Sequence, residues 1–385
     1  MRVDGPAVMR RIARVVENGR RHYEDLFAGD AGVAIVREPA RYVDGRLVVD
    51  GTPLVPVGTP TVLAVGARPA VAPLPGVGEV PFVTSDALLR MEDLPSSLAI
   101  VGGGPIAVEF AQALRRLDVP VTMVIRAELP LRGEEPEARE AVARILRADG
   151  VRLVTSAHGI GLERSPHGVR VRFDGGSAEA AHVLLATGRE PTIADLDPAA
   201  AGIELEDGGA RVSPTLATTA PGVFAIGDAI AGDHRRYQFT HVATHEGPQV
   251  AENALRGAAH APGYAAMPRV TFTDPEVAAV GLTEAEAREH GHDVHVELKL
   301  IRQLGKARAV GETEGFVKLV LDRGTQRLLG ATVFCAHGGD MLAELTIPLH
   351  VHDGDLAPVL ATTFAHPTLS EGIKVAVRNA LGRLA

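Results

Sequence analysis

The chain has 385 residues, 46% of them hydrophobic and 23% charged, which fits an ordinary globular protein with two or three domains. A net charge of −9, without a Lys/Arg tract interleaved with aromatic residues, argues against a nucleic-acid partner. No apolar run reaches the length of a membrane span and the first segment is too charged for a secretory signal, so we expect a cytoplasmic protein without a membrane partner. The single cysteine, Cys335, excludes an intramolecular disulfide, and its apolar context predicts a buried side chain rather than a nucleophile.

The first part of the chain predicts one helix followed by short strands. Apolar residues at helical spacing indicate a helix over Pro6–Phe27. Alternating runs at 32–36, 40–54 and 59–69 predict strands. The Asp-Gly steps at 44–45 and 50–51 are typical of tight hairpin turns.

The stretch from Ser96 to Arg126 predicts a strand–turn–helix–strand unit. An apolar run, Leu98–Val101, is followed by GGGPIA at 102–107 and by a second apolar run at 119–125. This is the context that the dinucleotide-binding fingerprint requires. In the helix between the runs, one predicted face holds Ile106, Phe110, Ala113 and Leu114.

The turn itself predicts dinucleotide binding. Gly102 permits a tight turn, Gly104 lets the backbone approach a pyrophosphate, and Ala107 allows the helix to pack closely on the sheet. The free N–H groups and the dipole of the helix would face the phosphates. The predicted contacts are Gly102, Gly103, Gly104, Ile106 and Ala107. A purely structural turn is the alternative.

The end of the second strand indicates which dinucleotide is bound. NAD enzymes tend to place an acidic residue there for the ribose 2′-hydroxyl, whereas this chain has Arg126 there and Arg132 in the loop that follows. Guanidinium groups match phosphate oxygens, so we predict NADP(H) rather than NAD(H). Two solvated loop arginines are the alternative, because the chain has 39 Lys and Arg residues.

Further helices and strands follow in alternation. The patterns predict helices over Glu135–Asp149 and His245–Arg256, and a capping box at Thr283 and Glu286 that starts another helix ending at Gly291. Predicted strands lie at 150–154, 168–173, 180–188, 222–230, 269–273, 316–321 and 328–334.

Six stretches, in unbroken order along the chain, resemble the flavin-dependent pyridine nucleotide–disulfide oxidoreductases, the family of glutathione reductase, dihydrolipoamide dehydrogenase and mercuric reductase. They are AVGARP (64–69), IVGGGPIAVEFA (100–111), TGREPT (187–192), APGVFAIGD (220–228), RVTFTDPEVAAVGLTE (269–284) and AHPTLSEGIK (365–374). The resemblance implies an α/β fold with two Rossmann-like nucleotide-binding domains, the FAD one incomplete, and a C-terminal α+β dimerisation domain. The implied ranges are 1–93 with 214–260 for FAD, 94–213 for NAD(P)H and 264–385 for the interface of a homodimer.

The resemblance also implies residues that contact the cofactors. Asp228 resembles the acid that accepts a hydrogen bond from a flavin ribityl hydroxyl, although a simple turn acid is the alternative. Gly188 and Arg189 resemble residues on the nicotinamide side. The remaining implied flavin contacts are Val65, Gly66, Ala67, Gly227, Thr240 and His241.

His366 and Glu371 resemble the acid–base pair of the family, presented to the flavin site of the partner subunit. A carboxylate fixes the histidine tautomer and raises its basicity, which suits proton transfer near neutral pH. The alternative is that Glu371 only caps a helix, because Thr368 and Glu371 form a capping-box pattern. His350 and His352 have no third placed ligand, so we assign no metal site.

The resemblance has a gap before the first helix. Family members open with a Gly-rich unit for the ADP half of FAD, then a Cys-x-x-x-x-Cys helix and a lysine that pairs with the equivalent of Glu109; this sequence shows none of these. We therefore expect no thiol–disulfide exchange on this chain and compromised FAD binding, through truncation or as a natural remnant. The predicted function is FAD-dependent hydride transfer from NADPH to a small-molecule acceptor; the alternative is a catalytically silent NADP(H)-binding dimer.

Overall fold

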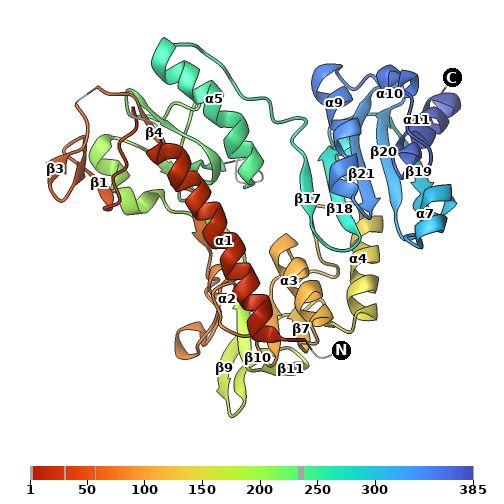
Figure 1. Cartoon of the computed structure of the whole chain (residues 1–385), viewed down its shortest axis with the longest axis horizontal. Coiled ribbons are helices and arrows are strands. Elements are labelled where there is room, and N and C mark those ends of the chain that lie inside the picture. Colours follow the sequence, from red (N-terminus) through yellow and green to blue (C-terminus); the bar gives the residue numbers. More distant parts are fainter. Residues whose placement is uncertain (1–2, 30–31, 57, 233–237, 385) are drawn as a thin grey trace. The chain divides into compact units, whose positions relative to one another are not determined.

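The computed structural model describes residues 3–29, 32–56, 58–232 and 238–384. The chain divides into two compact units (Figure 1), and each is described by itself. The first unit comprises Met1–Ala72, Val83–Leu94 and Thr187–Gly263. The second comprises Pro73–Phe82, Pro95–Ala186 and Tyr264–Ala385.

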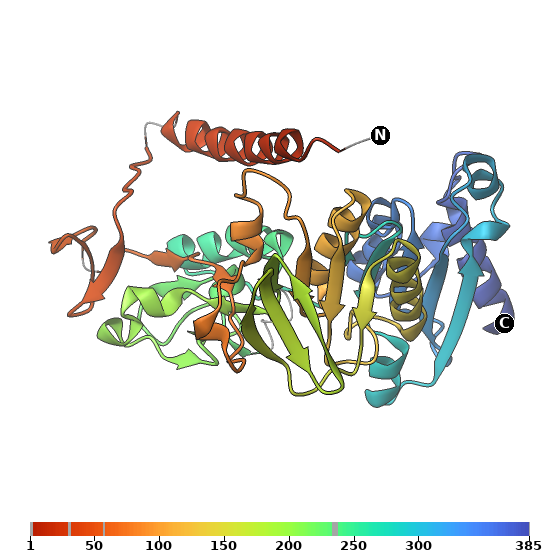
Figure 2. The same ribbon diagram turned by 90° about the horizontal axis from the view of Figure 1, so that it is seen from below.

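The first unit begins with the long helix α1 (Gly5–Ala28), in agreement with the predicted helix. Asp4 caps it, because its carboxylate accepts a hydrogen bond from the Ala7 N–H at 2.9 Å. Of this helix, drawn in red in Figure 2, only Gly5 and Met9 are buried.

Two hairpins follow in the first unit, formed by β1 (Ala40–Val43), β2 (Arg46–Val49) and β3 (Thr52–Pro53). Both Asp-Gly turns have positive φ at their two residues, as the sequence predicts. The predicted strand at 32–36 is wrong: these residues form no strand, and Val33, Ile35 and Val36 stay about half exposed. An alternating pattern makes a strand only where another strand can pair with it.

A parallel strand pair organises the core of the first unit. β4 (Thr61–Leu63) pairs with β16 (Val223–Ala225), and β5 (Ala67–Pro69) pairs antiparallel with β13 (Arg189–Pro191). Leu63, Ala225, Ile230 and Val250 belong to the same buried cluster. Helix α5 (Thr240–Arg256) begins five residues before its predicted start at His245. The smaller elements are α2 (Ser85–Leu88), β14 (Leu205–Glu206), β15 (Gly209–Ala210) and the 3₁₀ turns η2 (Ile193–Leu196), η3 (Pro198–Ala201) and η4 (Gly227–Ala229).

The second unit contains a four-stranded parallel sheet in the order β12–β6–β7–β8. All four residues of β6 are buried, which explains its uninterrupted apolar sequence. The antiparallel sheet of β9 (Gly161–Ser165), β10 (Gly168–Phe173) and β11 (Gly176–Ala180) shares a buried cluster with the parallel strands. The other bounds are β6 (Leu98–Val101), β7 (Val121–Val124), β8 (Arg152–Val154), β12 (His182–Leu185), α3 (Pro105–Arg116), α4 (Pro136–Ala148) and η1 (Val77–Glu79).

Helix α3 buries a different face from the predicted one. Its buried apolar residues are Ala107, Val108, Ala111 and Leu114, whereas Ala113 is exposed and Ile106 and Phe110 are only partly buried. The small side chains face the sheet because the helix lies close to it. The polar side chains of Glu109, Gln112 and Arg116 meet residues 272–274: Glu109 and Gln112 accept hydrogen bonds from the N–H groups of Phe272 and Asp274, at 2.8 and 2.7 Å. Arg116 pairs with the Asp274 carboxylate at 2.5 Å.

The C-terminal part of the second unit is a five-stranded antiparallel sheet, in the order β17–β18–β21–β20–β19, with helices packed against it (Figure 1). Its strands are β17 (Arg269–Thr271), β18 (Glu276–Gly281), β19 (Val294–Leu300), β20 (Phe316–Asp322) and β21 (Leu328–Cys335). The helical segments are α6 (Glu284–Glu289), η6 (Ile301–Gln303), α7 (Gly305–Val310), α8 (Gly338–Met341), α9 (Ala343–Val351), α10 (Ala357–Ala361) and α11 (Glu371–Leu384). The capping box of α6 forms as predicted, and Gly291 follows its end at φ +87°.

Cys335 is fully buried at the end of β21, with its Sγ 3.7 Å from the Sδ of Met341. Burial raises the pKa of this thiol to about 12. It therefore packs as a small apolar side chain, as its sequence context predicts. Among the helices of the described ranges, none is both long and apolar enough to cross a membrane.

Candidate functional site

The Gly-rich turn directly follows β6, and its three glycines meet different surroundings. Gly102 has φ +139°, and a Cβ there would lie 2.2 Å from the Ala186 carbonyl oxygen. At Gly103 a Cβ would lie 3.1 Å from the Cγ2 of Ile125. Gly104 has an ordinary backbone, φ −81° and ψ −178°, and a Cβ there would meet nothing within 4 Å. The packing of the protein therefore restricts the first two glycines, whereas the third faces open space.

The open side of Gly104 lies where helix α3 begins. Pro105 occupies the first turn of the helix, and the N–H groups of Ile106 and Ala107 have no intrahelical acceptor in this position. Partial positive charge at the helix N-terminus favours an anion there. The turn thus fits the pyrophosphate of a dinucleotide, because it offers hydrogen-bond donors and no side chain that would block the approach.

The loop with the two predicted specificity arginines is attached to this turn. β6 and β7 are parallel, so their carboxyl ends meet at the same edge of the sheet. The Leu131 N–H donates to the Gly103 carbonyl oxygen at 2.8 Å, and the Leu131 side chain is buried. Arg126 and Arg132 are both exposed and, among the described residues, neither has an ion-pair or hydrogen-bond partner. The geometry allows both guanidinium groups to meet a ligand.

Glu109, on helix α3, is partly buried, and burial raises the pKa of its carboxyl group against a smaller lowering by the Phe272 N–H. The resemblance implied a lysine partner for this residue. In this structure its partner is the backbone of Phe272 instead.

The first unit brings together another group of predicted residues. β4 and β16 are parallel, so the turns that follow them, at Val65–Ala67 and Gly227–Asp228, lie at the same edge of the strand pair. Arg189 joins the two turns: its Nη2 donates to the Ala67 carbonyl oxygen at 2.5 Å, and its Nε lies 3.5 Å from Oδ2 of Asp228. Gly188, directly before it, has φ +123°. Ligands of α/β sheets bind outside the carboxyl ends of the strands, which is where this group lies.

Asp228 has the environment of a hydrogen-bond acceptor. Its side chain is 18% exposed, and burial raises the pKa of its carboxyl group while Arg189 lowers it. Gly66, at the same edge, has φ +69° and open space on the side where a Cβ would lie. A partly buried carboxylate at the same edge as an open backbone fits a flavin with a ribityl hydroxyl to donate.

Helix α5 is fixed to the Gly227–Asp228 turn by a residue that the sequence did not reveal. The Gly227 N–H donates to Oε2 of Glu246 at 2.6 Å, and Glu246 is 1% exposed. Glu246 lies four residues from Val242 on one side and from Val250 on the other, both buried, and this spacing was the available signal.

Thr240 and His241 lie on the first turn of this helix and are exposed, with the His241 ring stacked on Phe239 at 5.2 Å between centroids. Each unit therefore assembles its own part of the predicted site.

His366 and Glu371 form a hydrogen-bonded pair in the second unit, with Nδ1 of the ring 2.9 Å from Oε1 of the carboxylate. The hydrogen bond from His366, and then that from the Thr368 N–H, lowers the pKa of Glu371. An ionised carboxylate only accepts hydrogen bonds, so Nδ1 is the donor and Nε2 of a neutral ring keeps its lone pair. The cap alternative holds in part, because Thr368 N–H also donates to Glu371 at 3.0 Å, but the Thr368 hydroxyl donates to the Ala365 carbonyl oxygen instead of closing a capping box.

Comparisons with known proteins agree with this geometry. The family model for pyridine nucleotide-disulphide oxidoreductases matches residues 7–247, and the model for the dimerisation domain of the same family matches residues 267–377. The chain belongs to the pyridine nucleotide-disulphide oxidoreductase family. The predicted fold class, with nucleotide-binding domains followed by a C-terminal dimerisation domain, is thereby confirmed.

Curated relatives include two kinds of reductase or dehydrogenase. The mercuric reductases of Acidithiobacillus ferrooxidans and Bacillus cereus are 34% and 33% identical to the chain, over 95% and 97% of its length. The dihydrolipoyl dehydrogenase of Chlamydia pneumoniae is 32% identical over 96% of the chain. The chain spans 67%, 59% and 79% of the length of these three relatives.

Solved structures give the same result. The HOCl-induced flavoprotein disulfide reductase RclA from Escherichia coli superposes with a TM-score of 0.87 at 29% identity, over 96% of this chain and 85% of that one. LpdA from Mycobacterium tuberculosis superposes with a TM-score of 0.85 at 25% identity, over 96% of this chain and 83% of that one.

Proposed function

We propose that the chain is a flavoprotein oxidoreductase that uses NADPH and FAD and delivers electrons to a small-molecule acceptor. The observation that supports it most is the turn at Gly102–Gly104, whose third glycine faces open space at the start of α3 while the loop with Arg126 and Arg132 is hydrogen-bonded to it. When bound, the two cofactors supply hydride transfer from nicotinamide to flavin. The rest of the proposal concerns the residues of the chain.

The binding roles follow from the donors and acceptors described above. The N–H groups of the first turn of α3 would hold the pyrophosphate, and the two arginines would pair with the 2′-phosphate. Asp228 would accept a hydrogen bond from the flavin ribityl chain, with Arg189 linking its carboxylate to the Ala67 backbone. We retain the predicted ranges for the FAD, NAD(P)H and interface domains as part of this proposal.

His366 and Glu371 would move protons rather than electrons. Glu371 fixes the tautomer in which Nδ1 donates, so Nε2 is the atom that would take or give a proton. The His366 side chain is 79% exposed, which leaves it accessible to a second copy of the chain. A homodimer formed by the dimerisation domain would let each protomer present this atom to the flavin site of its partner.

Cys335 is not suited to thiol–disulfide exchange. The only cysteine in the sequence is buried, with its pKa raised to about 12, and a thiol needs to ionise in order to attack. This observation favours a second candidate, a dimeric protein that binds NADP(H) without turnover.

Titration with NADPH and NADH tests the cofactor assignment. We expect the chain to bind NADPH more tightly, and Arg126→Ala and Arg132→Ala to weaken NADPH binding by about tenfold each while changing NADH binding little. Arg152→Ala is the matched control, because Arg152 is an exposed arginine on the first residue of β8, at the opposite end of the same sheet. Equal affinity for the two dinucleotides would contradict the proposal.

Reconstitution with FAD separates the two candidate functions. We expect the wild type to take up FAD and reduce a dye with NADPH, and Asp228→Asn to need more FAD for the same uptake. Tight NADPH binding with no FAD uptake and no turnover would instead establish the silent binding protein.

A further inference from the structure

The loop between β7 and α4 determines where the two specificity arginines lie. Both guanidinium groups lack a partner among the described residues, so their location depends on the backbone that bears them. Near the Gly-rich turn this backbone is held by the bond from Leu131 N–H to Gly103. Arg139 of α4 adds hydrogen bonds to the carbonyl oxygens of Pro130 and Leu129, at 3.1 and 3.3 Å.

The other end of the loop is held by the C-terminal sheet. Glu134 pairs with Nε of Arg269 at 2.8 Å. Glu135 accepts a hydrogen bond from the Glu284 N–H at 2.7 Å through one oxygen, and its other oxygen lies 2.9 Å from Nζ of Lys318. Arg132 therefore lies only two or three residues before Glu134 and Glu135, whose ion pairs attach the loop to the C-terminal sheet. We call these ion pairs the charged attachment of the loop.

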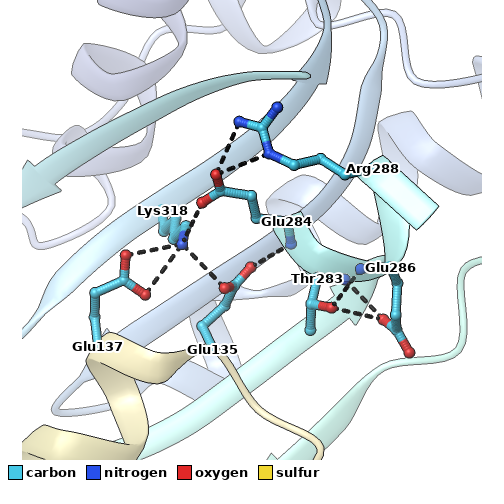
Figure 3. Close-up of polar contacts among 7 residues, drawn as sticks. All are labelled: Glu135, Glu137, Thr283, Glu284, Glu286, Arg288 and Lys318. Atoms are coloured by element: carbon cyan, nitrogen blue, oxygen red, sulfur yellow. Dashed lines mark hydrogen bonds and ion pairs between the residues drawn. The ribbon is translucent and has the colours of Figure 1, made fainter. Parts of the chain in front are cut away.

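Lys318 is the centre of this attachment, which Figure 3 shows. The residue is 1% exposed, and its ammonium group contacts three carboxylates: Glu135 at 2.9 Å, Glu137 at 2.8 Å and Glu284 at 3.1 Å. Glu135 is 2% exposed, whereas Glu137 and Glu284 are partly open to solvent. Burial by itself would lower the pKa of Lys318, but the hydrogen bonds to Glu137, Glu135 and Glu284, together with the charge of Glu135, outweigh it and raise the pKa.

The position of the loop end at Glu135 depends on Lys318, because the ammonium group neutralises a buried carboxylate. Without the ammonium group, Glu135 would be a buried carboxylate held by one backbone N–H, and an unpaired buried charge is strongly unfavourable. The carboxylate would have to protonate or move toward water, and the backbone on which Arg132 lies would move with it. Arg144 and Glu314 join the same two parts of the unit at 2.5 Å, but both are exposed and neither contacts the loop.

We propose that Lys318 is a positioning residue for dinucleotide selectivity, which sets through Glu135 the place where Arg132 meets the 2′-phosphate of the ligand. This inference rests on the proposed NADPH function. It assigns part of the selectivity to a side chain on β20, about two hundred residues from the Gly-rich turn, that touches no ligand.

Calorimetric titration with 2′,5′-ADP and with 5′-AMP tests the inference, because these probes differ only in the 2′-phosphate and need neither flavin nor turnover. We expect the wild type to prefer 2′,5′-ADP. Lys318→Met should weaken 2′,5′-ADP binding by about fivefold or more and 5′-AMP binding by less than about twofold. Glu135→Gln keeps the acceptor for the Glu284 N–H but loses the charge, and should reduce the preference by a smaller factor. Arg144→Met is the matched control and should keep the wild-type ratio.

The outcomes are distinguishable. If Lys318→Met does not fold by circular dichroism, Glu135→Gln decides the test alone. A wild type that binds both probes equally overturns the NADPH assignment and this inference with it. A wild type with a clear preference that folded Lys318→Met and Glu135→Gln retain in full overturns the positioning role and leaves the cofactor assignment standing.

Discussion

Substitution by alanine should lower the stability of the protein at Gly102, the first glycine of the GGG turn. At Gly104, the third glycine, it should instead weaken ligand binding and leave the stability nearly unchanged. At Gly102, alanine would place its Cβ 2.2 Å from the Ala186 carbonyl oxygen, at φ +139°. Such a backbone costs a non-glycine residue about 1–3 kcal/mol, and overpacking adds about 1–3 kcal/mol. We expect Gly102→Ala to lower the free energy of unfolding by about 2–6 kcal/mol, which shifts the midpoint of thermal unfolding down by about 3–7 °C for a chain of this length.

At Gly104 the same methyl group meets only open space, and φ −81° is an ordinary value for alanine. Restricting the unfolded chain contributes about 0.4–1 kcal/mol to stability, and a poorer helix N-cap removes a similar amount. Gly104→Ala should therefore unfold within about 2 °C of the wild type. It should nevertheless bind 2′,5′-ADP about tenfold more weakly, because the methyl group occupies the space that a phosphate needs.

Thermal unfolding and calorimetric titration at one fixed ionic strength measure both effects on the same samples. The assignment of the turn would be refuted by a Gly104→Ala variant that binds 2′,5′-ADP as tightly as the wild type. Loss of stability in that variant, as large as in Gly102→Ala, would show that the open space at Gly104 is wrongly described.

Three further predictions concern other parts of the second unit. Cys335 should not react with a thiol reagent at pH 8 in the folded protein and should give one equivalent after denaturation; reaction without denaturant would contradict its burial. Thr283→Ala removes the capping box of α6 and should cost about 1 kcal/mol in urea unfolding, whereas Thr283→Ser should cost less than half of that. The hydrogen bonds from His292 and Thr325 lower the pKa of Asp322 from 3.8 to about 2. A lowered carboxyl pKa contributes stability above pH 4 that is lost as the pH falls toward 2, so the gap in unfolding midpoint between the wild type and Asp322→Asn should shrink as the pH falls from 4 to 2; a gap that stays unchanged over that range would contradict the assignment.

The sequence predicts elements well where the signal is local. Leu98–Val101 is a strand with the predicted bounds. A short continuous apolar run followed directly by a glycine turn is typical of a buried strand. The run at 32–36 shows the limit, because its alternation is as clear but no strand in the described part of the chain pairs with it. In α3, two neighbouring apolar stripes compete, and periodicity alone does not show that the stripe with the smaller side chains is the one that faces the sheet.

Some residues of the candidate site could likewise be predicted from a local sequence signal, and others could not. The glycines and arginines of the turn stand in one short stretch, so their chemistry could be inferred before the fold was known. Glu246 and Lys318 could not be interpreted, because a charged residue in a sequence suggests solvent exposure. Their partners explain their burial, and Glu135 lies about 180 residues from Lys318 along the chain. Only the folded chain brings such groups together.

The contacts of α3 with residues 272–274 affect how this protein can be cut or recombined. Glu109, Gln112 and Arg116 of helix α3 hold a loop that comes more than 150 residues later in the sequence. A fragment ending near residue 213 would leave these three side chains without those partners, and a chimera with the corresponding domain of a relative would bring mismatched ones. Any graft of this module should therefore include the strand and loop at 269–275 as a matched piece.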